Sequence, residues 1–264
     1  MSLKKSLFYL ALVLLFTPLL GNAGCEQAVV NGSGETATWD MDYSDFNRLE
    51  INSAFDVTIN QAETYLVRIT IDKALYAYLK IDQRGDTLRI GLKSNYNYIN
   101  MTPQAVIGLP DLHGLKLSDA SKAAVKGFSV SHSLDFELTD ASELELTDIM
   151  SGNSNFTLHD ASHASGNIQM DDGNFNLSDA SNLKLSGSGE DITMRGSSSS
   201  ELELADFPVT TASVDLSSAS HAIIKVSTRM DVKLSAASVL EYIGSPKLGK
   251  LEMSEGSQLN QIQP

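Results

Sequence analysis

The sequence predicts an all-β protein, a parallel β-helix or β-solenoid with coils of about twenty residues and a less regular, β-rich N-terminal part. Three observations predict it. A short motif recurs at nearly constant spacing, apolar and polar residues alternate on either side of each copy, and no helical periodicity separates the copies.

The recurring motif is clearest in the C-terminal part of the chain. Four segments have the sequence Leu-x-Asp-Ala-Ser, namely 117–121, 138–142, 158–162 and 177–181. Weaker copies follow at 194–198, 216–220, 234–238 and 253–257. Such a period indicates one small structural unit per copy, stacked on its neighbours to bury a shared core.

Alternation around each copy predicts the strands. The first motif residue is Leu or Met, and the residue two positions earlier is also apolar, as in Phe136 and Leu138. This period of two is typical of a strand with one buried face. A second alternation, such as Leu144 and Leu146, follows several copies and predicts a second strand after an Asp-Ala-Ser corner. Propeller repeats are about 40 residues long, and leucine-rich repeats need an asparagine ladder and a helical return, so neither fits.

Two positions of the motif predict how the corner packs. The fourth residue is small in every copy, which indicates a corner without room for bulk. The fifth residue is serine in all eight copies, and stacked hydroxyls can bond to one another or to corner backbone groups. A catalytic serine would be single and would need a base beside it. The serine series therefore indicates a structural role: Ser121, Ser142, Ser162, Ser181, Ser198, Ser220, Ser238 and Ser257.

The N-terminus predicts export. Residues 1–23 have a short basic start, an apolar run at 7–16 and small residues before position 24, which is typical of a secretory signal peptide. Cys25 is the only cysteine, so no intramolecular disulfide forms. Residues 23–25 resemble the end of a bacterial lipobox, although Asn22 stands where that motif usually has Leu. Lipidation of Cys25, directing the chain to the outer membrane, and ordinary cleavage after Ala23 remain alternatives.

The chain after residue 23 divides into three segments that differ in how regularly the motif repeats. We expect a linker at 24–45, irregular β-coils or a cap at 46–110, and regular repeats at 111–264. A cap would protect the first coil from edge pairing. Within it, residues 51–55 weakly echo the repeat, and residues 72–80 predict one short helix.

The charge balance excludes some partners. Lys plus Arg number 19 against 33 Asp plus Glu, for a formal net charge of −14. Such a chain is unsuited to the phosphate backbone of nucleic acids or to anionic lipid surfaces. We therefore expect no nucleic-acid partner, and membrane association only through an N-terminal lipid.

These features together resemble one family. Residues 46–59, the strand pair 67–71 and 86–90, and the repeats that follow Pro110 are similar to the putative auto-transporter adhesin, head GIN domain family of secreted bacterial proteins. The resemblance covers nearly all of the chain after the signal peptide. It implies a β-helical fold in a periplasmic or surface setting, and it carries over no catalytic residues.

One column of carboxylates is a candidate metal site. Asp119, Asp140, Asp160 and Asp179 recur in successive coils, about 5 Å apart if stacked. Calcium could bridge such a ladder. The glycine-rich repeat of calcium-loaded solenoids is missing, however, and the alternative is that each carboxylate accepts backbone N–H bonds at its corner.

Other polar residues indicate a metal site or a catalytic site only weakly. His159 and His163 bracket one corner, but the matching positions in neighbouring coils lack metal ligands, so we expect exposed variants. The one irregular spacing, at 194–206, contains Arg195, Glu201, Glu203 and Asp206 and would be the place for a polysaccharide-cleaving site.

The function expected from these features is binding. A long polar rod suits repeated weak contacts to a glycan or another cell-surface ligand. We therefore expect a non-catalytic, exported adhesion or binding module of the periplasm, outer membrane or cell surface. A structural envelope protein without a ligand, or a polysaccharide-degrading enzyme, is the alternative. The sequence indicates no cofactor and fixes no oligomeric state.

Overall fold

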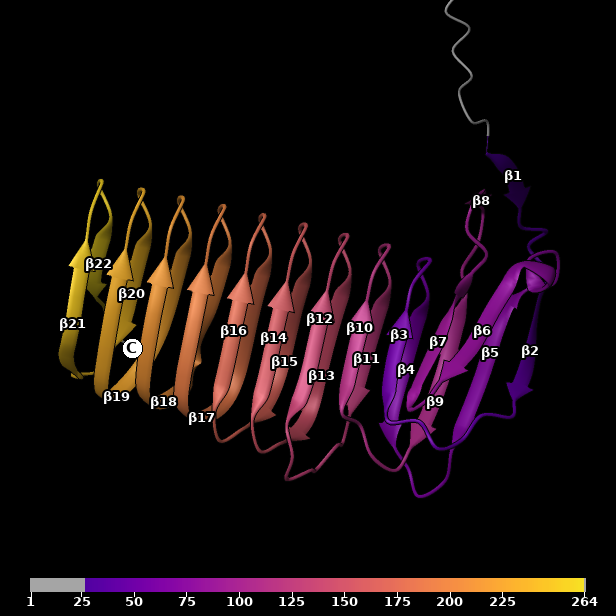
Figure 1. Cartoon of the computed structure of the whole chain (residues 1–264), viewed down its shortest axis with the longest axis horizontal. Helices are drawn as coiled ribbons and strands as arrows, with labels where there is room; N and C mark the ends of the chain where they lie inside the picture. Colours follow the sequence, from indigo (N-terminus) through magenta and orange to yellow (C-terminus); the bar gives the residue numbers. More distant parts are fainter. Residues whose placement is uncertain (1–26, 264) are drawn as a thin grey trace, which may run out of the picture.

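The computed structural model describes residues 27–263 and shows a stack of parallel β-coils closed at one end by an irregular β-cap (Figure 1). Strands account for 63% of the chain and helix for 1%, so the all-β prediction is confirmed. The predicted solenoid with coils of roughly 20 residues is also confirmed.

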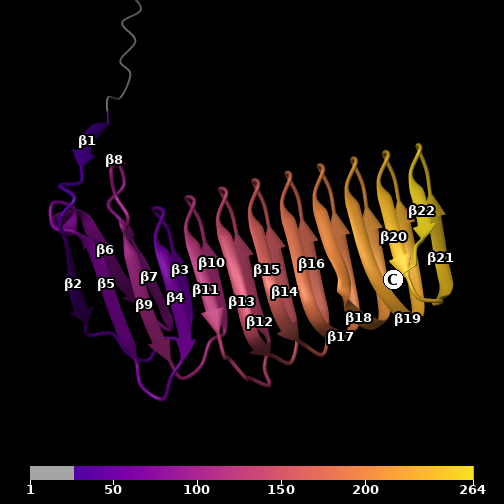
Figure 2. The same ribbon diagram turned by 180° about the vertical axis from the view of Figure 1, so that it is seen from behind.

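Each regular coil rises along one sheet, turns at a corner and descends along a second sheet (Figures 1 and 2). The rising strands are β3 (Arg48–Ile51), β10 (Gly114–Leu117), β12 (Leu134–Leu138), β14 (Ser154–Leu158), β16 (Gly173–Leu177) and β21 (Lys247–Met253). The descending strands are β4 (Asp56–Gln61), β11 (Lys122–Lys126), β13 (Glu143–Met150), β15 (His163–Gln169), β20 (Val239–Ile243) and β22 (Gln258–Gln261). Three long strands run from a descending position into the next rising one, namely β17 (Asn182–Gly196), β18 (Glu201–Leu216) and β19 (His221–Leu234).

The side chains between the two sheets form columns, because successive coils pair in parallel register. Phe136 pairs with Phe156, and Phe156 with Phe175. Their ring centroids lie 4.9 and 5.5 Å apart, and all three side chains are buried. The apolar positions picked out by the alternation thus form one continuous core.

The corner is a tight turn with a left-handed backbone. In the coil of residues 118–121, Ser121 N donates to Ser118 O at 3.2 Å, and Asp119 and Ala120 have φ of 54° and 57°. Two central residues with positive φ are typical of a type I′ turn. Asp tolerates this conformation better than most residues, which explains why it recurs there.

Neighbouring corners are joined through the main chain. Ala120 N donates to the carbonyl oxygen of Asp140 in the next coil at 2.8 Å, and the bond recurs along the stack. Within residues 27–263 no backbone N–H donates to a corner carboxylate, and the Asp140 carboxylate instead accepts from the Thr139 hydroxyl at 2.8 Å. The prediction of Asp side chains bonding to corner N–H groups is therefore wrong. The expectation of a crowded corner is also wrong, because Ala120 is exposed.

The serine column lies inside the corner and is buried. Ser142 Oγ donates to Thr139 O at 2.6 Å and lies 3.2 Å from Leu117 O in the preceding coil. Ser200 Oγ donates to Ser220 Oγ at 3.3 Å, so contacts to backbone and to the next hydroxyl both occur. The structural role predicted for this serine column is confirmed for the copies whose serine is buried, and Ser198 is the exception.

One copy of the motif was placed two residues early. Strand pairing aligns Gly196 with Leu177 and with Leu216, so the copy is 196–200 and not 194–198. Ser200 is 1% exposed, whereas Ser198 has φ of 55° and occupies the exposed turn. Met194 made the misplacement easy, because it is apolar and pairs with Phe175 in the core column. The apparent irregularity there, and the loop at 197–200, are an ordinary corner.

The cap begins with a coil that the sequence only hinted at. Strands β3 and β4 stack directly on β10 and β11, and Ala54 N donates to Asp119 O at 2.9 Å as in the regular corners. The echo of the repeat at 51–55 is therefore a true corner.

Beyond that coil the chain returns and changes direction. Strands β7 (Thr87–Leu92) and β9 (Gln104–Leu109) pair in parallel with β3 and β4. Antiparallel strands then cover them: β6 (Leu79–Arg84) on β7, β5 (Leu66–Asp72) on β9, and β2 (Thr36–Met41) on β5. A small parallel pair, β1 (Ala28–Asn31) and β8 (Tyr96–Ile99), lies beside them. The change to antiparallel pairing ends the parallel stack.

Three expectations about the N-terminal part have plain outcomes. The segment 24–45, expected as a linker, contains β1 and β2. The helix expected at 72–80 is a single 3₁₀ turn, η1 (Tyr76–Tyr78), because β5 and β6 occupy the rest. The signal peptide at 1–23 and Cys25 lie outside the described residues. Among the described residues, no helix is long and apolar enough to cross a membrane.

Candidate binding groove in the cap

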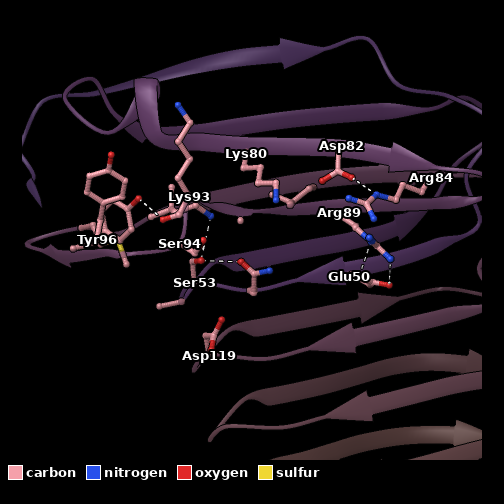
Figure 3. Close-up of a pocket in the computed structure, with 17 residues that line it drawn as sticks. Glu50, Ser53, Lys80, Asp82, Arg84, Arg89, Lys93, Ser94, Tyr96 and Asp119 are labelled. Carbon is pink, nitrogen blue, oxygen red and sulfur yellow. Dashed lines mark hydrogen bonds and ion pairs between the residues drawn. The ribbon is translucent and has the colours of Figure 1, made fainter. Parts of the chain in front are cut away.

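A hollow with a volume of about 450 Å³ lies on the outer face of the cap (Figure 3). We call it the cap groove. Strands β3, β6 and β7 form its floor and one wall, the segment from Lys93 to Met101 closes the other end, and the corners at Asn52–Ala54 and Asp119 form its rim. Figure 3 shows Tyr96, Ser94 and Ser53 at one end, an ion-paired cluster at the other, and Lys80 between them.

The ion-paired end is built by strand register. The period of two places Lys80, Asp82 and Arg84 on one face of β6. Asp82 is opposite Arg89 in β7, and Arg89 is opposite Glu50 in β3. Arg84 Nε lies 2.9 Å from Asp82, and Arg89 Nε lies 2.8 Å from Glu50. These four charges therefore neutralise one another.

Two lysines of the cap groove carry positive charge that no carboxylate offsets. Lys80 and Lys93 form no ion pair with any residue in 27–263. Lys93 Nζ donates to Ala77 O at 2.8 Å, which directs it towards η1. Lys80 is exposed and reaches over the middle of the groove. Lys126, Lys225 and Lys247 also form no ion pair within residues 27–263, but they lie outside the groove.

Tyrosines form the other end. The rings of Tyr78 and Tyr96 meet edge to face at 4.9 Å, and Tyr98 lies 5.9 Å from Tyr78. The Tyr98 hydroxyl donates to Lys93 O at 2.7 Å, and burial, with Tyr96 and Tyr78 beside it, raises the pKa of Tyr98. Tyr96 is 37% exposed, so part of its ring faces solvent. The cluster thus holds one exposed ring in a fixed orientation.

A glycine makes room for the Asn52 side chain opposite Lys80. Gly91 pairs with Lys80 across the β6–β7 register, and a Cβ at Gly91 would lie 1.8 Å from Asn52 Oδ1. Only glycine leaves room for the Asn52 amide there. Ser53 Oγ donates to Asn52 Oδ1 at 2.8 Å and accepts from Leu92 N at 3.1 Å. The groove floor therefore presents oriented amide and hydroxyl groups.

On the outer faces of the regular coils, several lysines pair with carboxylates of a neighbouring coil. Lys116 bonds to Glu137, Lys122 to Glu143, Lys184 to Glu203 and Lys233 to Asp215. Each pair joins neighbouring coils at matched register positions. Exposed pairs of this kind contribute little stability individually.

The candidates taken from the sequence do not all gather into one site, although Glu203 and Asp206 line a second hollow together with Lys184. Asp119, Asp140, Asp160 and Asp179 project singly from successive exposed corners. His159 Nδ1 contacts Ser178 Oγ at 2.6 Å, and His163 belongs to no group of three or more metal-ligating side chains in the described chain. Arg195 lies on the rising face beside Asn176 at 3.3 Å, whereas Glu201 and Glu203 belong to the descending face. Of these residues, only Asp119 borders the cap groove.

Sequence reasoning missed the cap groove itself. Its residues come from β3, β6, β7 and the segment near β8, between which no repeat gives the register. Two local signals were present: alternating charges over 80–84 and the Tyr-Asn-Tyr run at 96–98. Neither indicates a groove without knowledge that the chain folds back on the first coil.

The fold and the groove together define a class: a two-sheet β-solenoid with a cap and an open surface groove. A family model described as putative auto-transporter adhesin, head GIN domain matches residues 45–246, and the chain belongs to this family. The family indicates an adhesion-like role and an exported or cell-surface setting. No curated protein matches the sequence.

Solved structures share the fold at low sequence identity. A putative adhesin from Parabacteroides merdae matches with a TM-score of 0.82 and 16% identity, covering 89% of this chain and 99% of that one. A putative lipid binding protein from Parabacteroides distasonis gives the same four values. A putative adhesin from P. distasonis has a TM-score of 0.82 and 14% identity, covering 89% and 100%. At such identities the likeness shows the fold alone.

Proposed function

We propose that this chain is an exported, non-catalytic adhesion module whose cap groove binds an acidic glycan. The observation that carries the proposal is that Lys80, without an ion-pair partner in residues 27–263, lines the same open groove as the exposed ring of Tyr96. Export and attachment to the outer membrane through Cys25 are part of the proposal, as the N-terminal sequence indicates.

The chemistry of the groove suits a sugar with a carboxylate. An exposed tyrosine face can cover the apolar C–H face of a pyranose ring while its rim stays wet. Asn52, Ser53 and Ser94 offer amide and hydroxyl groups for sugar hydroxyls. Lys80 supplies a cation for a uronic or sialic acid carboxylate. Because the groove is open, an internal stretch of a long chain can enter it.

Two features argue against a hydrolase or lyase. The carboxylates in the groove wall, Glu50 and Asp82, are ion-paired to arginines. Where a carboxyl pKa in the described chain is clearly shifted, as for Asp40, Asp72, Asp111 and Asp231, it is lowered. A glycosidase acid needs a raised pKa to hold its proton.

A lipid ligand suits the groove less well. One fold neighbour is described as a putative lipid binding protein. An acyl chain needs an enclosed apolar cavity, whereas the cap groove is open and lined largely by charged and hydroxyl-bearing side chains. A purely structural envelope role would leave the groove without a ligand.

Affinity electrophoresis tests the proposal. The purified protein is run through gels containing uronate-rich or neutral polysaccharides, and mobility is expressed relative to a gel without polysaccharide. We expect retardation by acidic polysaccharides, lost in a Lys80→Gln/Tyr96→Ala double variant. A Lys184→Gln/Tyr76→Ala variant is the control, since it makes the same chemical changes at exposed positions outside the groove.

Each other outcome contradicts part of the proposal. Retardation that persists in the groove variant places the ligand elsewhere on the chain. No retardation across a broad panel favours a structural envelope role, and release of unsaturated or reducing sugar ends shows catalysis. Retardation only in gels that carry lipid vesicles would favour a lipid ligand.

A further inference from the structure

Three metal-ligating side chains meet at the edge of the molecule opposite the corners. Asp111 and His113 lie between β9 and β10, and His132 lies in the loop between β11 and β12 (Figure 1). His113 Nε2 is 2.9 Å from Asp111 Oδ2, and His132 Nε2 is 2.7 Å from Asp111 Oδ1. Among residues 27–263 this is the only group of at least three such ligands within 4.8 Å of one another.

The fold holds these side chains in place. Leu112, between Asp111 and His113, is buried, which turns its two neighbours to the same outer side. His113 N donates to Asn47 O at 2.7 Å, and His132 O accepts from Gly152 N at 3.1 Å. Asp111 and His132 are 21 residues apart, so one coil of the solenoid brings them together. All three side chains are partly buried.

The orientation of His132 is that of a metal ligand. Its Nδ1 lies 3.0 Å from Ser133 O, and because a carbonyl only accepts, Nδ1 carries the hydrogen. In the neutral ring the Nε2 lone pair then points towards the cluster. A backbone carbonyl that fixes the outer nitrogen in this way is the usual outer partner of a metal-bound histidine.

The two imidazole rings lie side by side against one carboxylate. The rings of His113 and His132 stack at 3.9 Å with an angle of 20°, and both Nε2 atoms face one carboxylate. The two Nε2 atoms and the carboxylate therefore lie close enough together to share one cation.

From this arrangement we propose that Asp111, His113 and His132 bind one divalent transition-metal ion of the zinc type. Two imidazoles and one carboxylate suit Zn²⁺, Co²⁺ or Ni²⁺, whereas Ca²⁺ takes six to eight oxygens. Zinc bonds of about 2.0–2.1 Å place tetrahedral ligand atoms about 3.3 Å apart. The carboxylate therefore needs to withdraw by only about half an ångström.

The bound metal joins two parts of the chain. Asp111 and His113 come from the passage out of the cap, and His132 comes from the first long loop of the regular coils. A metal bridging them fixes this passage, and binding to the folded state alone raises stability in proportion to metal concentration. The three protein ligands leave the remaining positions to water.

Isothermal titration with Zn²⁺ and thermal unfolding test the site. The reference protein carries Cys25→Ser, so that the thiol adds no ligand. We expect one Zn²⁺ per chain and a higher melting temperature with zinc. Affinity should fall about tenfold or more in His132→Gln and in Asp111→Asn. The control is His221→Gln, since His221 also lies near two carboxylates, 3.9 Å from Glu201 and 3.5 Å from Glu241.

The proposal has clear contrary results. It is overturned if the reference protein shows no saturable zinc binding, or if His132→Gln and Asp111→Asn bind zinc like the reference. It is equally overturned if His221→Gln abolishes binding. Circular dichroism of each metal-free variant shows whether it is folded, and Co²⁺ spectra of the reference protein report imidazole and carboxylate coordination independently of stability.

Discussion

The two ends of the described solenoid carry the same side-chain pattern and have different surroundings. At the cap end, Leu88 in β7 occupies the column that continues through Leu49 and Leu115, and it is 0% exposed because β5 and β6 close the stack. At the other end, Leu251 in β21 occupies the same column and is 48% exposed. Within residues 27–263, no strand covers the outer side of β21 and β22.

This difference shows what repetition does and does not provide. The repeat sets which residues point inward, but burial depends on a neighbour on each side. Regular coils also give every position the same surroundings, so a unique groove is hard to form there. The cap breaks the repeat with antiparallel strands and a returning loop, and it contains the cap groove. In this molecule the irregular end both closes the core and supplies the candidate site.

The largest expected effect compares two members of one column. Phe156, fully buried between Phe136 and Phe175, should lose about 3–5 kcal/mol of unfolding free energy on change to alanine, through lost contacts and an unfilled cavity. Leu251→Ala should lose less than about 1 kcal/mol, since half of that side chain already faces water. Urea unfolding followed by far-ultraviolet circular dichroism measures both.

Equal losses of unfolding free energy in Phe156→Ala and Leu251→Ala would contradict the difference between the buried core and the open end. They would mean that the outer side of β21 is covered in solution, for example by a second copy of the chain. Measuring Leu251→Ala at several protein concentrations separates the two cases, because coverage by a second copy makes its unfolding midpoint depend on concentration.

The second largest expected effect is the loss of cap stability when one buried carboxylate is protonated. Asp72 is 4% exposed and accepts bonds from Ser33 Oγ at 2.9 Å, Gly34 N at 2.6 Å and Ala74 N at 2.8 Å. Burial opposes its ionisation, but these hydrogen bonds outweigh burial and lower the pKa of Asp72. The stabilisation that ionised Asp72 gives to the folded protein is therefore fully present above its unfolded pKa of about 3.9. It is lost as the pH falls through the lower pKa of the folded state.

We expect the cap to loosen in acid before the coils do. Trp39, the only tryptophan, lies in β2 and stacks on Tyr76 at 4.2 Å, so its fluorescence reports on the cap alone. Between pH 5 and pH 2 the fluorescence midpoint should precede the circular dichroism midpoint, and Asp72→Asn should destabilise the cap at neutral pH. Asp160→Asn, at an exposed corner, is the control. Coincident midpoints in the unmodified protein would show that the cap and coils unfold together.

The fold was largely predictable from the sequence because each coil repeats the same short motif and the same alternation of apolar and polar residues. Alternation around Phe136 and Leu138 indicates the strands, and the copies give the parallel register without an alignment. The error at 194–198 has a physical reason: Met194 is as apolar as the leucines, and period-two alternation fits equally well two residues away. Only pairing with both neighbouring coils decides between the two positions.

The two candidate sites were less predictable, for different reasons. The cap groove needs the returning path of β6 and β7, which no local pattern fixes. The cluster of Asp111, His113 and His132 follows from one coil of separation, but attention to the corner column led to Asp119 and its equivalents instead. His132 lies in a loop outside every strand column, so strand periodicity alone could not align it with His113.

The smallest expected effect compares two corner serines that the repeat makes equivalent. Ser142 Oγ lies within hydrogen-bonding distance of Leu117 O and Thr139 O, whereas Ser181 Oγ is buried without a partner in residues 27–263. Ser142→Ala should therefore cost about 1 kcal/mol of unfolding free energy, since its hydrogen bond is lost. Ser181→Ala should be neutral or slightly stabilising, because it removes a buried hydroxyl without a partner. Urea midpoints at a constant denaturant slope measure the difference. If both variants lose the same free energy, rotation of the Ser181 hydroxyl towards Ser178 O supplies the missing bond, and the serine column is uniform along the stack.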